Sequence, residues 1–179
     1  MSEINPQNTF DDFRTPRDLF CSFDERFHFD IDVAASDENK LCENYYTEED
    51  DGLSLQWYGN VWCNPPYSNV KVWLHKALNE LSSGRCQTVV FLLNVDTSTQ
   101  YFHDIILASA QEIHLIRGRV NFEGPHVGDG ANPKASMMVV FTNNLNPEKQ
   151  YLNTIYTDGT NTGRQTKLNF GIVETLSSS

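Results

Sequence analysis

The stretch Asn60-Val61-Trp62-Cys63-Asn64-Pro65-Pro66-Tyr67 decides how the surrounding chain folds. Its apolar residues predict a strand. That strand cannot continue through two prolines, because proline has no backbone N–H and biases the residue before it away from helix. Apolar residues then recur at helical spacing from Val70 to Leu81, ahead of Gly84. We therefore predict a strand that ends at Asn64, a rigid loop and then a helix.

Asn64, the two prolines and Tyr67 have the chemistry to hold a planar amine. Such an amine presents two N–H donors, and the Oδ1 atom of Asn64 can accept one while the carbonyl of Pro65 accepts the other. Pro66 stiffens the loop, and Tyr67 offers a ring face on which a base can stack. The alternative is a plain Pro-Pro turn after an edge strand, so the rest of the chain must decide.

The chain of 179 residues has the size of one domain. Residues 1–14 are polar and lack a sustained period, which predicts a flexible arm, and residues 15–179 are predicted to form the single domain. No apolar run approaches membrane-spanning length, and the first residues lack the pattern of a signal peptide. We expect a protein of the cytoplasm with no membrane partner, and its oligomeric state stays open.

The formal net charge of −11 is unusual for a protein that binds nucleic acid. Acidic residues concentrate between Asp24 and Asp51, so a local basic face remains possible later in the chain. Four cysteines lie far apart without a C-x-x-C pair, which predicts free, mostly buried thiols and no metal site. The basic residues that follow the acidic region are Lys71, Lys76, Arg85, Arg117, Arg119, Lys134, Arg164 and Lys167.

Thr15-Pro16 is predicted to open a helix, with Thr15 as the N-cap and Pro16 in the first helical position. An apolar stripe then follows on Leu19, Phe20, Phe23 and Phe27. The chain alternates between apolar and polar residues from Phe27 to Val33, which predicts a strand. Asp32 lies at the end of this strand and is followed by the small residues 34–36. This arrangement is typical of a strand end that faces a ligand in an open α/β sheet. The alternative is a solvated edge strand.

The remaining elements complete an alternating pattern of strands and helices. Continuous apolar runs predict buried strands at 88–93 and 136–141, and a shorter strand at 113–116. A helix is predicted to start in 97–99, a mobile loop covers 123–135, and the polar tail has one strand-like run at 168–173. Residues 37–52 are acidic and loop-like, although Tyr45-Tyr46 indicates a tether to the core. The expected class is α/β, with a largely parallel sheet and helices on both faces.

Six segments in this order resemble the phage and prophage DNA N-6-adenine methyltransferases, a Dam-like family. The resemblance covers roughly residues 13–142, and the ordered set is more specific than Asn-Pro-Pro-Tyr alone. It implies a Rossmann-like methyltransferase fold, S-adenosylmethionine as methyl donor and double-stranded DNA as partner, with the target adenine flipped out of the duplex. The segments are Thr15-Pro16, Asp32 to Ser36, Asp51 to Leu53 with Trp57, Asn64 to Tyr67, Gly118-Arg119 with Phe122, and Ser136 to Phe141.

The resemblance also implies roles for residues that match the family. Asn64, Pro65, Pro66 and Tyr67 match the catalytic motif. Thr15-Pro16 resembles the segment that closes over the methyl donor, and Asp32 with Ala34 resembles the first-strand motif near its methionine part. Asp51 resembles the acidic residue that contacts the donor's adenine, although Asp50 is equally placed. The chain departs from related folds in lacking a glycine-rich turn and an evident acidic ribose-binding residue.

Substrate contacts are predicted on both sides of the motif. Tyr67 would stack on the flipped base, and Phe122 would either cover its other face or serve as a core aromatic. Arg117, Arg119 and Lys134 are candidate phosphate contacts. The same amine geometry would serve cytosine N4, RNA adenine or a protein amide, and the acidity would also suit a non-catalytic DNA mimic. The target sequence is not predicted.

Overall fold

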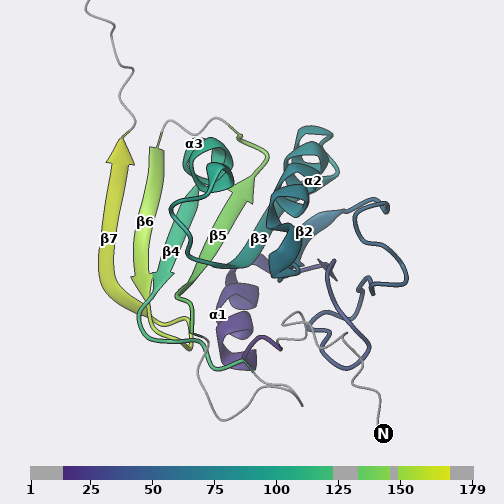
Figure 1. Cartoon of the computed structure of the whole chain (residues 1–179), viewed down its shortest axis with the longest axis horizontal. Coiled ribbons are helices and arrows are strands. Elements are labelled where there is room, and N and C mark those ends of the chain that lie inside the picture. Colours follow the sequence, from purple (N-terminus) through teal and green to yellow (C-terminus); the bar gives the residue numbers. More distant parts are fainter. Residues whose placement is uncertain (1–13, 123–132, 146–148, 170–179) are drawn as a thin grey trace, which may run out of the picture.

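Seven strands form one sheet in the order β1-β2-β3-β5-β4-β6-β7 (Figure 1). The computed structural model describes residues 14–122, 133–145 and 149–169. The arm predicted for residues 1–14, apart from Arg14, and most of the predicted mobile loop therefore lie outside the described residues. The strands are β1 (Ile31–Asp32), β2 (Gly59–Cys63), β3 (Cys86–Asn94), β4 (Glu112–Ile116), β5 (Ser136–Thr142), β6 (Lys149–Ile155) and β7 (Asn161–Asn169).

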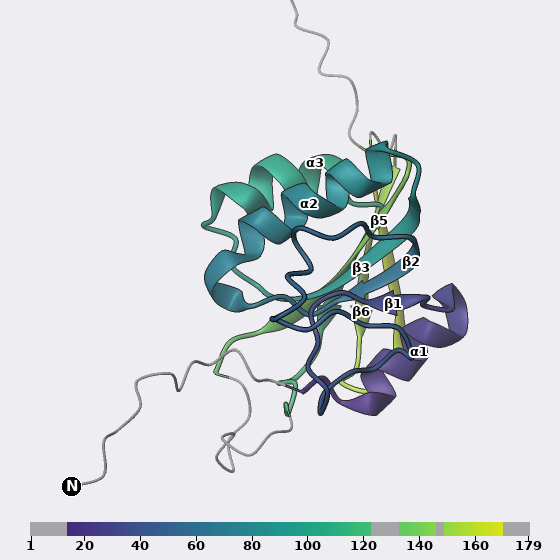
Figure 2. The ribbon, with the colours of Figure 1, turned by 90° about the vertical axis from the view of Figure 1, so that its right-hand side faces the viewer.

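The sheet is mixed rather than largely parallel. β1, β2 and β3 are parallel to one another, as are β4 and β6, but β5 is antiparallel to both β3 and β4 and β7 is antiparallel to β6. β5 runs against both of its neighbours, so the middle of the sheet departs from the parallel pattern that a regular alternation of strands and helices would give. The predicted α/β class is confirmed, with α2 and α3 on one face and α1 on the other (Figure 2).

Two hydrophobic clusters cover the two faces of the sheet. β3 serves both, since Val89 and Phe91 belong to the cluster beneath α2 (Val70–Ser82), while Val90 belongs to the cluster beneath α1 (Arg17–Phe27). Burial on both faces explains the continuous apolar run of this strand. The predictions of a helix from residue 70, of buried strands at 88–93 and 136–141, and of a shorter strand at 113–116 are confirmed.

The amino end of α1 differs from the prediction. The helix begins at Arg17 with Pro16 as the N-cap residue, and among the described residues no side chain caps it. Thr15 is therefore not the N-cap. Its hydroxyl contacts the side chain of Asn64 instead.

The strand predicted from Phe27 to Val33 is too long, because β1 covers Ile31–Asp32 alone. Phe27 still belongs to α1, and His28 ends that helix in the left-handed conformation at φ 50°. The chain must turn at this point before it can enter the sheet. Phe29 lies in the connection, where its ring packs against Trp62 at a centroid distance of 5.5 Å.

The sequence-based reading missed β6 and most of β7. Both strands are rich in polar residues and lie at one side of the sheet, where a clear apolar period is absent. Of the strand-like run predicted at 168–173, the first two residues fall in β7 and the rest lie outside the described residues. The helix predicted to start in 97–99 is present as a π-helical segment, η2 (Phe102–Ile106), that continues into α3 (Leu107–Ser109).

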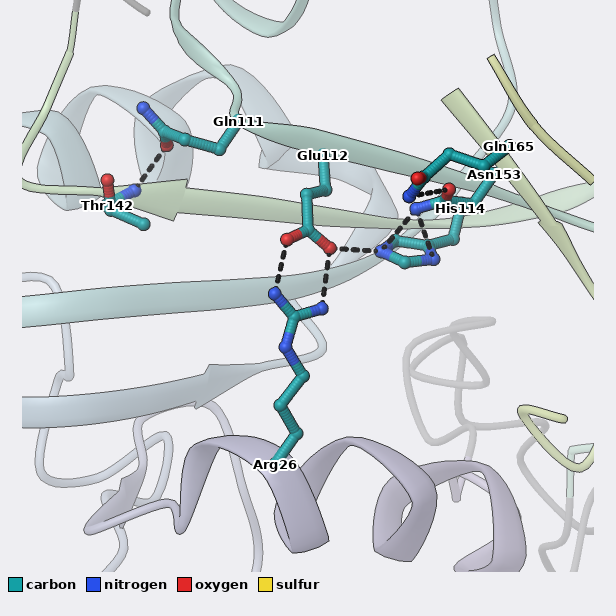
Figure 3. A network of polar contacts seen from close by, with 7 residues as sticks. All are labelled: Arg26, Gln111, Glu112, His114, Thr142, Asn153 and Gln165. Atoms are coloured by element: carbon teal, nitrogen blue, oxygen red, sulfur yellow. Dashed lines mark hydrogen bonds and ion pairs between the residues drawn. The ribbon is translucent and has the colours of Figure 1, made fainter. Parts of the chain in front are cut away.

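A polar network fastens α1 to the strands β4, β6 and β7 (Figure 3). Arg26 of α1 binds both carboxylate oxygens of Glu112 on β4, with Nη1 at 2.8 Å from Oε2. His114 Nε2 lies 2.8 Å from the same Oε2 atom, and Asn153 Nδ2 lies 3.2 Å from His114 Nδ1. Gln165 Nε2 donates to Asn153 Oδ1 at 2.9 Å. One face of α1 is thereby held on the sheet by directional contacts as well as by packing.

Glu112 is expected to make the stability of the fold depend on acid. Burial disfavours its charged form, but hydrogen bonds from His114 and Arg26 outweigh that effect and lower the pKa from 4.5 to about 2. A carboxylate with a depressed pKa in the folded state stabilises above its unfolded pKa and loses that contribution as the pH falls toward the folded pKa. Because Arg26 is half exposed and solvent screens its charge, we expect Glu112 to contribute about 2 kcal/mol to the free energy of unfolding.

Glu112→Gln should therefore lower the free energy of urea unfolding by about 2 kcal/mol at neutral pH. The difference from the unmodified protein should shrink as the pH falls from about 4.5 toward about 2. Urea titrations at several pH values measure this difference. A difference that stays constant with pH would mean that the charge of Glu112 does not stabilise the fold.

Candidate active site

The strand pattern brings the ends of several elements to one edge of the sheet. β1, β2, β3, β4 and β6 all end at this edge and β5 begins there, as their pairing requires. In Figure 1 it is the lower edge, where α1 also lies. Asp32 and Asn64 follow from neighbouring parallel strands, since Asp32 pairs with Trp62, two residues before Asn64. The two side chains that the sequence singled out therefore lie side by side in the fold.

Asn64 is the first residue after β2, and the prolines behind it shape a short rigid loop. Pro66 has an extended backbone with φ −53° and ψ 129°, and its carbonyl accepts a hydrogen bond from the Asn69 amide at 3.2 Å. That bond closes the 3-10 turn η1 (Tyr67–Asn69), which leads directly into α2. The predicted order of strand, rigid loop and helix is confirmed.

Asp32 is buried, with 3% of its surface exposed, so the alternative of a solvated edge does not hold at this residue. Its Oδ1 accepts from the backbone N–H of Ala34 at 3.3 Å, and its Oδ2 accepts from that of Leu41 at 3.2 Å. Burial raises the pKa of Asp32 to about 7, although these two hydrogen bonds act in the opposite direction. With a pKa near neutrality, this carboxyl group would be driven to its charged form by a positive charge placed beside it.

One hollow joins residues that are distant in the sequence. Four of the predicted site residues line it, namely Thr15, Asp32, Ala34 and Asn64. The Nδ2 atom of Asn64 donates to the Oγ1 atom of Thr15 at 3.3 Å, although the two residues are 49 positions apart. Pro16, the other half of the predicted Thr15-Pro16 pair, directly follows Thr15 at the N-cap of α1. The segment before α1, the end of β1 and the end of β2 therefore meet at one place.

Three further residues line the hollow that the sequence-based reading did not select: Asn39, Leu41 and Trp62. Trp62 could have been found, because strand alternation places it on the same face as Asn64. Asn39 belongs to a turn in which its Oδ1 accepts from the Ser36 amide at 2.6 Å. That turn has a recognisable Ser-x-x-Asn pattern, but the pattern alone does not indicate where the turn lies.

A short segment at residues 44–46 pairs with the end of β1. Tyr45 forms a parallel bridge to Asp32. The backbone N–H of Asp32 donates to the Asn44 carbonyl at 3.0 Å, and the Tyr46 amide donates to the Asp32 carbonyl at 2.9 Å. The predicted tether at Tyr45-Tyr46 is confirmed, and it keeps the acidic region against the end of β1.

Asp50 and Asp51 follow this tether but are not among the described residues that line the hollow. The Asp50 carboxylate accepts from both the backbone N–H and the hydroxyl of Thr47 at 2.8 Å, and these bonds lower its pKa. Asp51 has a left-handed backbone with φ 54° and accepts from the hydroxyl of Ser54. Contact of either residue with a ligand stays a prediction.

Gly52 explains how the acidic segment can approach β1 so closely. A Cβ atom at this position would lie 2.3 Å from the carbonyl oxygen of Val33 and 3.3 Å from the ring of Trp73. The carbonyl of Gly52 accepts from Trp57 Nε1 at 2.7 Å. Any side chain would therefore push residues 51–52 away from the end of β1.

Tyr67 and Phe122 lie on the α1 side of the sheet. Phe122 is 4% exposed and belongs to the buried cluster that also contains Trp62, so it serves as a core aromatic in this structure. Tyr67 is half-buried and packs against the same cluster. Of the two roles considered for Phe122, the structure shows the core role, and contact with a base would require a rearrangement.

The predicted phosphate contacts lie at the same edge as Asn64. Arg117 and Arg119 are exposed directly after β4, and Lys134 is exposed shortly before β5. Lys134 lies near Asp96, whose pKa is lowered mainly by hydrogen bonds from Ser98 and further by the charge of Lys134. The two arginines are therefore the better candidates for contact with a polyanion.

The hollow combines two kinds of polar group. A buried carboxyl group at Asp32 can pair with an ammonium group, and an amide at Asn64 can accept a hydrogen bond from an amine.

Across the described residues, no group of three His, Cys, Asp or Glu side chains could hold a metal ion. The predicted free thiols are confirmed, with Cys63 and Cys86 buried and Cys21 and Cys42 half-buried. None of the described helices is both long and apolar enough to span a bilayer.

Comparison with known proteins connects this geometry to one family. The family model described as DNA N-6-adenine-methyltransferase (Dam) matches residues 3–165. A protein of that name from Haemophilus phage HP1 is 34% identical over 148 residues, which cover 79% of this chain and 84% of the relative. Another of that name, from Escherichia phage T1, is 36% identical over 113 residues, which cover 62% of this chain and 47% of the relative.

A solved structure supports the fold at lower sequence similarity. It is a modification subunit ascribed to a type I restriction enzyme from Vibrio vulnificus YJ016. Its TM-score to this chain is 0.53 at 10% identity, and the match covers 85% of this chain and 48% of that one. At this identity the likeness concerns the architecture of the sheet and its helices, which is a Rossmann-like α/β fold.

Proposed function

The chain belongs to the DNA N-6-adenine-methyltransferase (Dam) family, and from this premise we propose that it methylates the N6 amine of adenine in double-stranded DNA with S-adenosylmethionine as donor. The observation that carries this proposal is the hollow in which Thr15, Asp32, Ala34 and Asn64 meet. Asp32 and Ala34 were predicted to lie near the methionine part of the donor, Thr15 to belong to the segment that closes over the donor, and Asn64 to hold the amine. Their convergence supports a site in which the two reactants would lie within reach of each other.

Asp32 and its surroundings suit the methionine part of the donor. A carboxyl group that is buried and held by two backbone N–H groups is fixed in place, so it can pair with the ammonium group. Ala34 adds little bulk, and Asn39 and Leu41 form the adjoining wall of the hollow. S-adenosylmethionine supplies an electrophilic methyl group, whose carbon–sulfur bond breaks as the carbon bonds to nitrogen.

Asn64 and Pro65 are proposed to hold the amine. The N6 lone pair of adenine is delocalised into the ring, which makes the nitrogen a poor nucleophile. When Asn64 Oδ1 and the Pro65 carbonyl accept its two protons, they favour the pyramidal, partly positive nitrogen of the transition state. No base needs to act before attack, because the extra proton can leave for water after the methyl group has arrived.

Tyr67 is proposed to stack on the adenine once it has left the duplex. Flipping costs a few kcal/mol, which stacking and pocket contacts must offset. Pro66 shapes the loop between Asn64 and Tyr67, so the amide and the ring are presented from one rigid segment. Because the relatives are phage proteins, we place this activity in the cytoplasm of a bacterial host.

Arg117 and Arg119 are proposed to contact phosphates, which lets a chain of net charge −11 bind DNA locally. The double variant Arg117→Gln with Arg119→Gln should raise KM for duplex DNA by about tenfold and reduce the salt slope of binding by about 2. The affinity for the donor should not change. Fluorescence anisotropy of a labelled duplex over a range of salt concentrations measures the slope.

Arg85→Gln is the matched control for this pair. Arg85 is exposed, but it is paired with Glu80 at 2.7 Å and lies before β3, at the opposite edge of the sheet. Its removal should leave the salt slope of DNA binding unchanged. If both variants lowered the slope equally, the binding surface would not be the edge that carries Asn64.

Transfer of labelled methyl groups from S-adenosylmethionine tests which macromolecule is the substrate. Duplex DNA, single-stranded DNA, RNA and a protein mixture should be offered in parallel, and we expect label in duplex DNA. Label chiefly in RNA or protein would support a related amino-methyltransferase that acts on another amine. The DNA-mimic alternative predicts no label in any sample and no binding of the donor, and membership of the family argues against it.

A further inference from the structure

We propose that Thr15 is a positioning residue that orients the amide of Asn64 for the reaction. This inference rests on the proposed function, since it concerns how the same site performs methyl transfer. The two side chains are in direct contact, with Asn64 Nδ2 donating to Thr15 Oγ1 at 3.3 Å. Both line the hollow, where Thr15 is 7% exposed and Asn64 is half-buried.

A threonine placed as Thr15 is, just before a helix, ordinarily uses its hydroxyl for another purpose. A threonine before a helix commonly caps it, which contributes about 1 kcal/mol. Here α1 begins at Arg17, and within the described residues its amino end receives no side-chain cap. The hydroxyl is directed toward Asn64 instead, so a local stabilising contact has been replaced by one between distant segments.

The orientation of Asn64 matters because the two ends of an amide have opposite hydrogen-bonding character. The oxygen accepts protons, whereas the NH₂ group donates them and would face the N–H groups of the amine unfavourably. The two ends have nearly the same shape, so packing alone discriminates poorly between them. In this structure Thr15 Oγ1 accepts from Asn64 Nδ2, so the contact holds the nitrogen end of the amide toward Thr15 and turns the oxygen end away from it.

Packing of α1 against β2 brings together the two segments that carry this contact. Phe20 of α1 packs edge-on against Trp62 with ring centroids 5.1 Å apart, and its backbone N–H donates to the Pro16 carbonyl at 3.2 Å. Trp62 precedes Asn64 by two residues on β2. Docking of α1 on Trp62 therefore sets the distance between Thr15 and Asn64, and the network around Glu112 secures the other end of the helix.

Thr15→Val tests the hydroxyl without a large change in shape. We expect kcat for methylation of duplex DNA to fall by about tenfold, with KM for DNA and the calorimetric Kd for S-adenosylmethionine within about twofold of the unmodified protein. Thr15→Ser keeps the hydroxyl and should recover most of kcat. Thr88→Val is the matched control, because Thr88 is also buried but lies in the first part of β3, remote from the hollow. Thermal melting checks that each variant is folded.

Asn64→Asp provides a background that separates orientation from donor binding. A carboxylate has two equivalent acceptor oxygens, so its orientation need not be selected. If Thr15 acts by orienting the amide, Thr15→Val should cost kcat about tenfold with Asn64 present but less than about twofold with aspartate in its place. An equal loss in both backgrounds, or a loss that lies wholly in the Kd for the donor, would overturn the positioning role and favour direct donor binding.

The two proposals fail in distinguishable ways. If the unmodified protein transfers no methyl group to DNA, the proposed function is wrong. If the unmodified protein is active and Thr15→Val retains its full kcat, the proposed function stands and the positioning role of Thr15 is wrong.

Discussion

Asn64→Ala is expected to lower kcat for DNA methylation by about a thousandfold while the Kd for S-adenosylmethionine changes by less than about threefold. Removal of a preorganised hydrogen-bonding group that acts on the transition state typically costs about 10²–10³ in rate. Asn64 lies at the end of β2, where two prolines fix the loop that follows, so its amide acts from a rigid support. Alanine removes the acceptor and leaves that support intact. Single-turnover methylation and calorimetry measure the two effects separately.

Asn69→Ala is the control for this variant. Asn69 is an exposed asparagine in the same loop, and no described side-chain bond from it caps α2. Its replacement should leave kcat within about twofold of the unmodified protein. If Asn64→Ala retained near-normal kcat, the amine would be held by other groups and the mechanism proposed for the motif would be wrong.

Asp32→Asn is expected to weaken the binding of S-adenosylmethionine by about thirtyfold to a hundredfold. The substitution preserves size but removes the charge, and a hydrogen bond to a charged group contributes about 1.5–3 kcal/mol. Asparagine also cannot accept from both backbone N–H groups that the two carboxylate oxygens of Asp32 now satisfy. Isothermal titration calorimetry measures the change in Kd.

The pKa of Asp32 adds a dependence on pH. Burial raises this pKa to about 7, so below that pH the protein without donor carries a protonated carboxyl group. The ammonium group of the donor favours the charged form, so binding must release a proton in this range. We expect the Kd for the donor to rise by about tenfold for each pH unit below about 7. Calorimetry in buffers of different ionisation enthalpy detects the released proton.

Asp37→Asn provides the comparison for both effects. Asp37 is exposed, accepts from the Tyr45 hydroxyl at 2.7 Å and is not among the described residues that line the hollow. It should alter neither the Kd nor the proton release. Asp32→Asn should abolish the pH dependence, and a dependence that persisted in that variant would assign the titration to a different group.

The parts of the fold that could be predicted from the sequence were those under strong local control. Pro65 and Pro66 end β2 regardless of how the rest of the chain folds, so the strand, loop and helix around Asn64 follow from backbone chemistry. Asp32 and Asn64 could be paired because Asp32 ends one short strand and Asn64 follows another, in a chain where strands and helices alternate. The ends of parallel strands share an edge, which brings such residues together.

The remaining features depend on contacts that local patterns do not encode. Thr15 has the sequence of a helix cap, yet its hydroxyl contacts Asn64, 49 residues away. The aromatic ring of Phe122 would suit either a base contact or the core, and the packing of α1 on the sheet buries it. β6 and β7 are polar strands at one side of the sheet, where pairing of β6 with β4 and of β7 with β6 supplies a stability that hydrophobic periodicity does not reveal.

The position of the transferred methyl group tests the central claim most directly. Duplex DNA should be treated with S-adenosylmethionine carrying an isotopically labelled methyl group, digested to nucleosides and analysed by mass spectrometry. We predict label in N6-methyladenine with the unmodified protein and a loss of about a thousandfold in its rate of formation with Asn64→Ala. Label in N4-methylcytosine, or equal labelling of adenine by both proteins, would contradict the account.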